Sequence, residues 1–205
     1  MKKAVIFVLL AFSLALFAPA GPNEQVPNKT IDNLMIAFNG EFNANTRYMA
    51  FAKKAAEEGY APVAALFRAA ARAEQVHYEH HAAVIVSLGG KAKAEIEKPE
   101  VKTTRENVEA ALRGETYEYT KMYPGFLAQA EADRIKDAVI SIGNASEAEA
   151  VHARLFAGVL KDLEAWKSGA RTFYVCPTCG NILEARPASF CPICGEPGSE
   201  FMAVK

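Results

Sequence analysis

The chain has 205 residues, and 51% of them are apolar, which is enough for a substantial buried core. This length favours one main domain with a small additional module. Lysine and arginine number 23 against 24 aspartates and glutamates, a formal net charge of -1. That balance argues against a nucleic-acid partner and against binding to an acidic membrane surface. All four cysteines lie between Cys176 and Cys194, which indicates one local site rather than a framework of disulfides.

The N-terminal segment, residues 1–20, has the pattern of a secretory signal peptide. Lys2-Lys3 precede an uncharged, mostly apolar run over residues 4–17, and the small residues Ala18-Pro19-Ala20 follow. We therefore predict a signal peptide over residues 1–20, cleavage at its end and export to the periplasm. The alternative is a membrane anchor that is not cleaved, because the uncharged stretch continues to Asn23 and is just long enough to span a bilayer.

The rest of the chain up to Gly169 reads as four long helices. They are predicted to run from Asn28 or Thr30 to about Glu58, from Pro62 to Gly89-Gly90, from Thr103 or Thr104 onward with a kink at Pro124-Gly125, and from about Asp133 to Trp166. A polar connection over residues 91–102 joins the second helix to the third. Four long helices with one long middle connection predict an all-α fold, a four-helix bundle of ferritin-like topology.

Each predicted helix has an apolar stripe at steps of three and four residues, and charged or imidazole side chains interrupt each stripe near its middle. The interruptions repeat: Glu41 is followed on the next helix by Glu74-x-x-His77, and Glu115 is followed at nearly the same spacing by Glu149-x-x-His152. The seven interrupting residues are Glu41, Glu74, His77, Glu115, Glu118, Glu149 and His152. Unpaired ions on a buried face are costly, so something must compensate them.

A pair of metal ions is the compensation that this pattern favours. A glutamate and a histidine three residues apart share a helix face and can reach one ion. One glutamate from each of two helices with Glu-x-x-His from each of the other two is the arrangement of di-iron carboxylate bundles. A single Glu-x-x-His is more often a solvated helix face, but two copies with paired upstream glutamates favour metal. Glu118 exceeds the six ligands of the minimal pattern, so it is either a ligand or a hydrogen-bonding support for one.

Other polar residues near these stripes are interpreted more conservatively. His81 shares the face of Glu74 but lies about 10 Å further along the helix axis, so we place it at the edge of the site. His80 and Glu147 are expected to be solvated. Tyr48 and Tyr123 face the same region, where they either donate hydrogen bonds to the carboxylates or serve as large core residues.

The C-terminal segment contains two Cys-Pro-x-Cys-Gly knuckles, one starting at Cys176 and the other at Cys191. Their thiolates, from Cys176, Cys179, Cys191 and Cys194, fit a tetrahedral four-sulfur metal site. The motif alone fits zinc at least as well as a single iron, and disulfides are the alternative in an exported chain. The aromatic residues available for the core of this module are Phe173, Tyr174, Phe190 and Phe201.

A di-iron bundle followed by a rubredoxin-like knuckle module resembles the rubrerythrin family. The stretches that carry the resemblance are FNGEFNANTRY, EQVHYEHH, GETYEYTKMYP, EAVHARLF and the two knuckles, from about Thr30 to Val204. The resemblance implies a ferritin-like di-iron domain over residues 28–167 and a rubredoxin-like domain over residues 172–205. It assigns the di-iron ligands to the seven interrupting residues and a mononuclear iron to the four cysteines, with zinc as the alternative there. It also implies that one iron moves between Glu118 and His77 on redox change.

The same resemblance implies a non-haem di-iron peroxidase that reduces hydrogen peroxide to water, with electrons delivered through the four-cysteine iron by a donor protein. The alternatives are a ferroxidase or iron-handling protein and a zinc-filled structural protein. Similar proteins are usually cytoplasmic, so a signal peptide leaves the donor unidentified.

The length of the fourth helix predicts where the knuckle module lies. The helical stretch from Glu149 to Trp166 carries the chain about 25 Å from its own metal centre, and residues 167–172 reach about 20 Å at most. We therefore expect the iron of the module to lie far from the metal centre of its own bundle, and the module to dock on its partner's bundle in a head-to-tail homodimer.

Overall fold

The computed structural model describes residues 28–205. The predicted signal peptide and its alternative, an N-terminal anchor, both lie outside this range, so export stays a prediction. Within residues 28–205, no helix combines the length and the apolar composition needed to cross a membrane.

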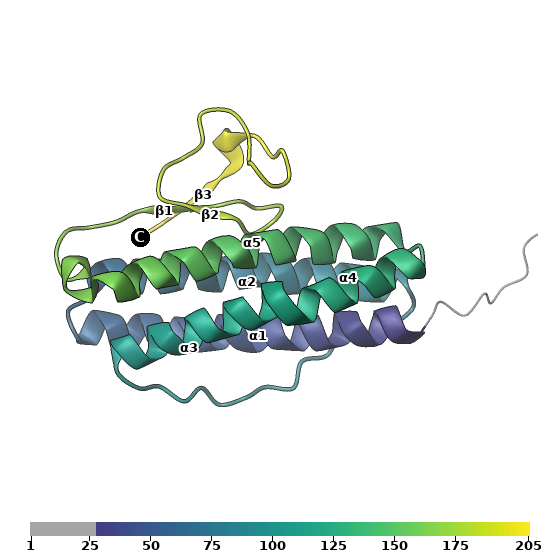
Figure 1. Ribbon diagram of the computed structural model, residues 1–205, viewed down its shortest axis with the longest axis horizontal. Helices are drawn as coiled ribbons and strands as arrows, with labels where there is room; N and C mark the ends of the chain where they lie inside the picture. The colour runs from purple at the N-terminus through teal and green to yellow at the C-terminus, as the bar shows by residue number, and fades with distance from the viewer. Residues whose placement is uncertain (1–27) are drawn as a thin grey trace, which may run out of the picture.

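Four helical rods form the body of the molecule (Figure 1). Their elements are α1 (Asn28–Glu57), α2 (Ala61–Ser87), α3 (Thr104–Tyr117), the π-helical segment η1 (Glu118–Met122), α4 (Tyr123–Ala132), α5 (Lys136–Lys161) and the 3-10 turn η2 (Leu163–Trp166). The segments α3, η1 and α4 follow one another as a single rod, and the long connection between α2 and α3 runs along the outside of the bundle (Figure 1). The predicted all-α, ferritin-like four-helix bundle is confirmed.

Local sequence explains where the helices begin and end. The turn between α1 and α2 contains Gly59 at φ +82°, a left-handed conformation that glycine adopts without strain. Pro62 then lies in the first turn of α2, where its missing N–H costs nothing. A capping box starts α3: the Thr103 side chain accepts from the Glu106 N–H, and the Glu106 carboxylate accepts from the Thr103 N–H.

The third rod departs from the prediction of a kink at Pro124-Gly125. The irregularity lies one turn earlier, in η1, where the helix widens to π geometry and the Tyr123 N–H donates to the Glu118 carbonyl. Pro124 lacks an N–H, and its ring would meet the carbonyl four residues back in a regular α-helix. The wider turn relieves this conflict and places Glu118 at the first position of η1.

Two of the apolar clusters among the described residues lie along the bundle. One contains the aromatic residues Tyr48, Phe51, Phe67 and Phe156, whose neighbouring ring centroids lie 5.3–6.3 Å apart. The other contains Leu34, Phe38, Ile85, Tyr123 and Ile142. Burying each large apolar side chain contributes about 1.5–3 kcal/mol, so these clusters stabilise a bundle that also buries charged residues.

The C-terminal module is a small antiparallel sheet in the order β2-β1-β3, built from Ile182–Leu183, Phe173–Val175 and Met202–Val204. Phe173, Val175 and Ile182 belong to the first apolar cluster of the bundle, and Phe173 stacks on Trp166 with ring centroids 6.4 Å apart. The module therefore packs into the core of its own bundle. The predicted module core is correct for Phe201 but wrong for Phe190, which is 63% exposed.

The position of the module corrects the distance estimate made from the sequence. The module lies along α2 and α5 of the same chain (Figure 1), and the Cys179 carbonyl lies 3.0 Å from His77 Nε2. The sequence-based estimate of the distance that the linker can span ends at Phe173. In the structure, β1 carries the chain further, back toward the middle of the bundle. From Lys167 to Cys179 an extended chain covers about 40 Å, which exceeds the distance of about 25 Å to be recovered. The knuckle therefore reaches its own bundle without a second chain.

Candidate metal centre

Six of the seven predicted ligands meet at the middle of the bundle. Two groups of four side chains have donor atoms that lie within 4.8 Å of one another. The groups are Glu41, Glu74, His77 and Glu149, and Glu74, Glu115, Glu149 and His152. All six side chains are buried, and Glu74 and Glu149 belong to both groups. Helices α1, α2, α3 and α5 thus contribute to one centre with two adjacent positions for an ion.

The two imidazoles face the carboxylates with the same nitrogen. His77 Nδ1 lies 2.7 Å from Glu149 Oε1 and 3.1 Å from Glu74 Oε2, and His152 Nδ1 lies 2.6 Å from Glu149 Oε2. The opposite nitrogens face the knuckle: His77 Nε2 lies 3.0 Å from the Cys179 carbonyl and His152 Nε2 lies 3.0 Å from the Gly180 carbonyl. A carbonyl only accepts, so each Nε2 carries the proton. Each Nδ1 is then left with a free lone pair, the form that binds metal.

Several buried carboxylate oxygens and one imidazole nitrogen of this centre have no hydrogen-bond partner among the described residues. They are Glu41 Oε2, Glu74 Oε1, Glu115 Oε2, both carboxylate oxygens of Glu149 and His152 Nδ1. Buried polar atoms are nearly always satisfied, and in their deprotonated form these all present lone pairs. Cations between them would satisfy every one, so the residues present fit a pair of divalent metal ions. A mixed set of carboxylates and imidazoles is typical of iron in such bundles.

Burial governs the acid–base state of the centre without metal. It raises the pKa of Glu41 to about 7 and raises the pKa of Glu74 and Glu149 well above their usual value, with neighbouring carboxylates adding to the effect on the latter two. Burial lowers the pKa of His77 well below its usual value, so this imidazole is neutral. Without metal, protons on these carboxyl groups thus take the place of cations.

Glu118 is the predicted ligand that stands apart. It belongs to neither group of four, and its side chain is partly buried at the start of η1. Burial, together with the nearby charges of Glu41 and Glu115, raises its pKa, so it lies within electrostatic reach of the centre. The structure therefore holds His77, and not Glu118, among the candidate ligands of the first group.

Two tyrosines support the carboxylates. Tyr48 donates to Glu115 Oε1 at 2.6 Å, and Tyr123 donates to Glu41 Oε1. Of the two interpretations open from the sequence, hydrogen bonding to ligand carboxylates is confirmed for both. His81 is fully buried and contacts Tyr123 and Ser141 rather than the candidate ligands, in agreement with its predicted place at the edge of the site.

The four cysteines form a second candidate metal site. Their sulfurs lie within 4.8 Å of one another, and the sulfurs of Cys176 and Cys194, like those of Cys179 and Cys191, are 3.5 Å apart. That separation is far longer than a disulfide bond, so all four cysteines are free. Backbone bonds from Gly180 to the Cys176 carbonyl and from Gly195 to the Cys191 carbonyl close the two knuckles. The disulfide alternative is excluded in this structure.

Sequence reasoning missed the contact that joins the two sites. The carbonyls of Cys179 and Gly180 are backbone groups, so no residue type signals their role. The one available signal was Gly180, whose φ of +73° requires glycine and whose Cα has no room for a side chain. A Cβ there would overlap His77 Nε2, at a separation that real contacts do not reach.

Gly180→Ala is expected to separate the knuckle from the bundle. The added methyl group meets His77 and is strained at a positive φ, so the two hydrogen bonds from the imidazoles should be lost. The melting temperature should fall, because a strained and clashing core substitution costs about 1–3 kcal/mol. Gly195→Ala is the matched control: its φ is +79°, but no atom lies within 4 Å of the added Cβ. Equal falls in melting temperature in both variants would contradict the assigned contact.

The fold and the site together define a ferritin-like di-iron carboxylate protein with a C-terminal four-cysteine module. Comparison with known proteins is consistent with this class. The family model described as Rubrerythrin matches residues 32–160. The chain belongs to the rubrerythrin family.

Individual relatives span nearly the whole chain. Nigerythrin of Nitratidesulfovibrio vulgaris is 35% identical over 85% of this chain and 86% of its own. Rubrerythrin of Porphyromonas gingivalis is 31% identical over 87% of this chain and 91% of its own. A solved structure of fully reduced, all-ferrous nigerythrin superposes with a TM-score of 0.79 at 34% identity, covering 85% of this chain and 86% of that one. A bacterioferritin of Mycobacterium tuberculosis, at 20% identity and a TM-score of 0.63 over 69% of this chain and 89% of its own, shares the fold.

Proposed function

We propose that this protein is a di-iron peroxidase, which reduces hydrogen peroxide to water with electrons delivered through the four-cysteine iron. The proposed ligands of the di-iron centre are Glu41, Glu74, His77, Glu115, Glu118, Glu149 and His152. Cys176, Cys179, Cys191 and Cys194 are the proposed ligands of the single iron. Solved structures of nigerythrin are described as fully reduced and partially reduced, so a relative with 34% identity changes oxidation state.

The observation that carries the proposal is the double contact between the two sites. Each imidazole of the centre donates to a knuckle carbonyl at 3.0 Å, and Cys179 is itself one of the four cysteines. A short bonded path therefore runs from a cysteine sulfur, through its own carbonyl, to the ring of His77. A storage protein or a zinc-filled scaffold has no need of such a path, whereas a reductase does.

The chemistry requires two electrons and two protons for each peroxide. When bound at the centre, two ferrous ions supply the electrons that break the O–O bond. The protein holds the carboxylates in place through Tyr48 and Tyr123, and it fixes both imidazoles in the metal-binding tautomer through the knuckle carbonyls. The buried surroundings exclude bulk water from the centre.

Metal content and reactivity test the proposal. Protein purified without oxygen should contain about three irons per chain, and the reduced protein should be oxidised faster by hydrogen peroxide than by dioxygen. Zinc in both sites would exclude redox turnover. Much faster oxidation by dioxygen would favour the ferroxidase or iron-handling alternative.

Glu118→Ala is expected to keep the bundle folded and to slow peroxide turnover by about tenfold or more. Glu118 lies outside both groups of four but within electrostatic reach of the centre, as expected for a carboxylate that replaces His77 when the iron is oxidised. The measurement is steady-state peroxide reduction, with thermal unfolding as the check on folding. Glu109→Ala serves as the control, because Glu109 lies in α3 of the same rod and belongs to neither group of four. Unchanged turnover in Glu118→Ala would exclude it as a ligand in either state.

The head-to-tail homodimer stays a proposal, although the estimate of chain reach no longer supports it. Two chains that exchanged their modules would make the same contacts between chains that the structure makes within one. Mixing a Cys176→Ser/Cys179→Ser variant with a Glu115→Ala/Glu149→Ala variant distinguishes the two cases. If the modules are exchanged between chains, heterodimers should show about half of the donor-driven activity, because one intact bundle then faces one intact module. No recovery, with heterodimers shown to be present, would place electron transfer within one chain.

Export is likewise proposed from residues 1–20 alone. The expected result is a mature protein in the periplasmic fraction that begins at Gly21, as read by N-terminal sequencing. A soluble cytoplasmic protein that begins at Met1 would contradict it, and a membrane-bound protein that keeps residues 1–20 would support the anchor.

A further inference from the structure

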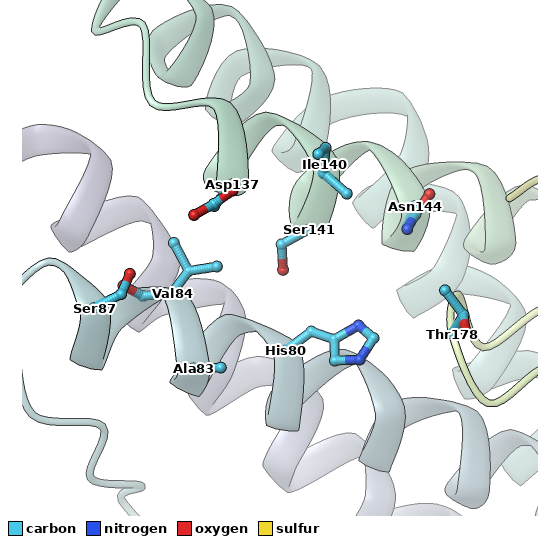
Figure 2. A pocket seen from close by; sticks show the side chains of 9 residues that line it. All are labelled: His80, Ala83, Val84, Ser87, Asp137, Ile140, Ser141, Asn144 and Thr178. Atoms are coloured by element: carbon cyan, nitrogen blue, oxygen red, sulfur yellow. The ribbon is translucent and has the colours of Figure 1, made fainter.

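A cavity of about 340 Å³ opens between α2 and α5, beside the knuckle (Figure 2). Its outer wall includes the exposed residues Ser87, Asp137 and Ile140, and Thr178 of the knuckle lies at one end. Ser141 of α5 lies on the inner wall with its hydroxyl directed into the space between the two helices (Figure 2). A water molecule takes up about 30 Å³ of liquid volume, so the cavity has room for several between solvent and Ser141.

A chain of hydrogen bonds leads from this cavity to the metal centre. Ser141 Oγ lies 2.8 Å from His81 Nδ1, and His81 Nε2 lies 3.2 Å from the Tyr123 hydroxyl. Tyr123 in turn donates to Glu41 Oε1. All four side chains are buried, and they come from α5, α2, α4 and α1. The chain thus crosses the bundle from a solvent-facing cavity to a candidate metal ligand.

The chemistry of the partners sets the direction of every bond. The Glu41 carboxylate accepts, so the Tyr123 hydroxyl gives its proton to this bond and its oxygen is left to accept from His81. His81 Nε2 therefore carries a proton. Burial, with the charge of His80 as a smaller contribution, lowers the pKa of His81 to about 3, so the ring is neutral and its Nδ1 is bare. Nδ1 then accepts from the Ser141 hydroxyl, and all three donors point toward Glu41.

We propose that Ser141, His81 and Tyr123 form a proton relay from the α2/α5 cavity to the di-iron centre. The inference rests on the proposed peroxidase function, because reduction of one hydrogen peroxide by two electrons takes up two protons and yields two waters. In one pass the O–H bond of Tyr123 breaks as an O–H bond to Glu41 forms. Tyr123 regains a proton from His81 Nε2, His81 gains one at Nδ1 from Ser141, and Ser141 gains one from water in the cavity, which bulk solvent reprotonates. Glu41 then gives its proton to a peroxide oxygen as the O–O bond breaks. Return of the imidazole tautomer and rotation of the hydroxyls reset the relay.

A purely structural role is the competing explanation, since a buried serine and histidine also satisfy each other. The side chains of threonine and valine have the same shape, and only threonine retains the hydroxyl. Ser141→Thr and Ser141→Val therefore add the same methyl group to the cavity side and the same β-branching to α5. A difference in reaction rate between the two variants therefore measures the effect of the hydroxyl and not of the packing. Ser87→Val is a further control, because Ser87 lies on the same cavity but donates to the Val84 carbonyl of its own helix.

The experiment follows the oxidation of iron-loaded, reduced full chain by one equivalent of hydrogen peroxide, in H₂O and in D₂O, by stopped-flow absorbance. Wild type, Ser87→Val and Ser141→Thr are expected to react within about twofold of one another. Ser141→Val is expected to react at least about tenfold more slowly, at the lower end of what a positioned proton donor contributes, with a changed solvent isotope effect. Iron content and the visible spectrum should be the same in all four proteins.

Each other result decides against a specific claim. Equal rates in Ser141→Val and Ser141→Thr, whether normal or slowed together, would overturn the relay. A wild-type protein that does not react with peroxide would overturn the proposed function instead. In that case the oxidation rates of Ser141→Thr and Ser141→Val would be compared with dioxygen as the oxidant, because two-electron reduction of dioxygen also takes up two protons. Equal rates of the two variants with dioxygen would overturn the relay independently of the peroxidase function.

Discussion

The metal-free protein is expected to lose more stability between pH 6.5 and pH 8.5 than a metal-free Glu74→Gln/Glu149→Gln variant. Burial raises the pKa of both carboxyls well above the usual 4.5, so the folded chain keeps protons that the unfolded chain has released. Stability then falls as pH rises through this window, by about 1.4 kcal/mol per pH unit for each retained proton. The glutamine variant has no proton to retain at these two positions.

Calorimetric melting temperatures of the metal-free proteins at the two pH values provide the measurement. A loss of about 1.4 kcal/mol corresponds to roughly 3–6 °C in melting temperature for a chain of this size. Iron-loaded wild type is the control, because ionised carboxylates that hold cations give no fall in stability with rising pH. Parallel pH dependences of the two metal-free proteins would contradict the raised pKa values of Glu74 and Glu149.

Glu149→Gln is expected to reduce bound iron from about three ions per chain to about one and to lower peroxide turnover by about a hundredfold or more. Glu149 is one of two carboxylates shared by both groups of four, and its two oxygens lie 2.7 Å from His77 Nδ1 and 2.6 Å from His152 Nδ1. An amide of the same size is a poor metal ligand and carries no charge to offset a cation. Both ion positions should therefore weaken together, while the four-cysteine site keeps its metal.

The matched control is Glu147→Gln, because Glu147 is exposed and lies two residues away on the same helix. Metal analysis and steady-state turnover should leave this control indistinguishable from wild type. A Glu149→Gln protein that retains about three irons per chain would show that Glu149 is not shared between two ions.

The candidate ligands could be predicted from the sequence because a metal site in a helical bundle repeats with the period of the helix. Glu74 with His77 and Glu149 with His152 interrupt apolar stripes at helical spacing, and the structure brings all four side chains together. The four-cysteine site could be predicted equally well, because its four cysteines lie close together in the sequence.

Features that depend on backbone atoms or on distant contacts could not be predicted in the same way. The Cys179 and Gly180 carbonyls reach imidazoles 102 and 28 residues away, and a carbonyl has no residue type to mark it. The π-helical turn before Pro124 arises from a steric conflict that sequence periodicity does not register. The position of the module was predicted wrongly because the reach of the chain was counted only to Phe173 and not through β1.

The most direct test of the central claim, that the four-cysteine iron feeds electrons to a di-iron centre that reduces peroxide, follows the four-cysteine iron itself. Fully reduced wild type and Glu149→Gln are each mixed with one equivalent of hydrogen peroxide without oxygen, and the absorbance of the oxidised four-cysteine iron is recorded against time. We predict oxidation at least about tenfold faster in wild type, because electrons leave that iron through the carboxylate-bound centre. Equal rates in the two proteins would show that peroxide oxidises the four-cysteine iron directly, and would contradict the central claim.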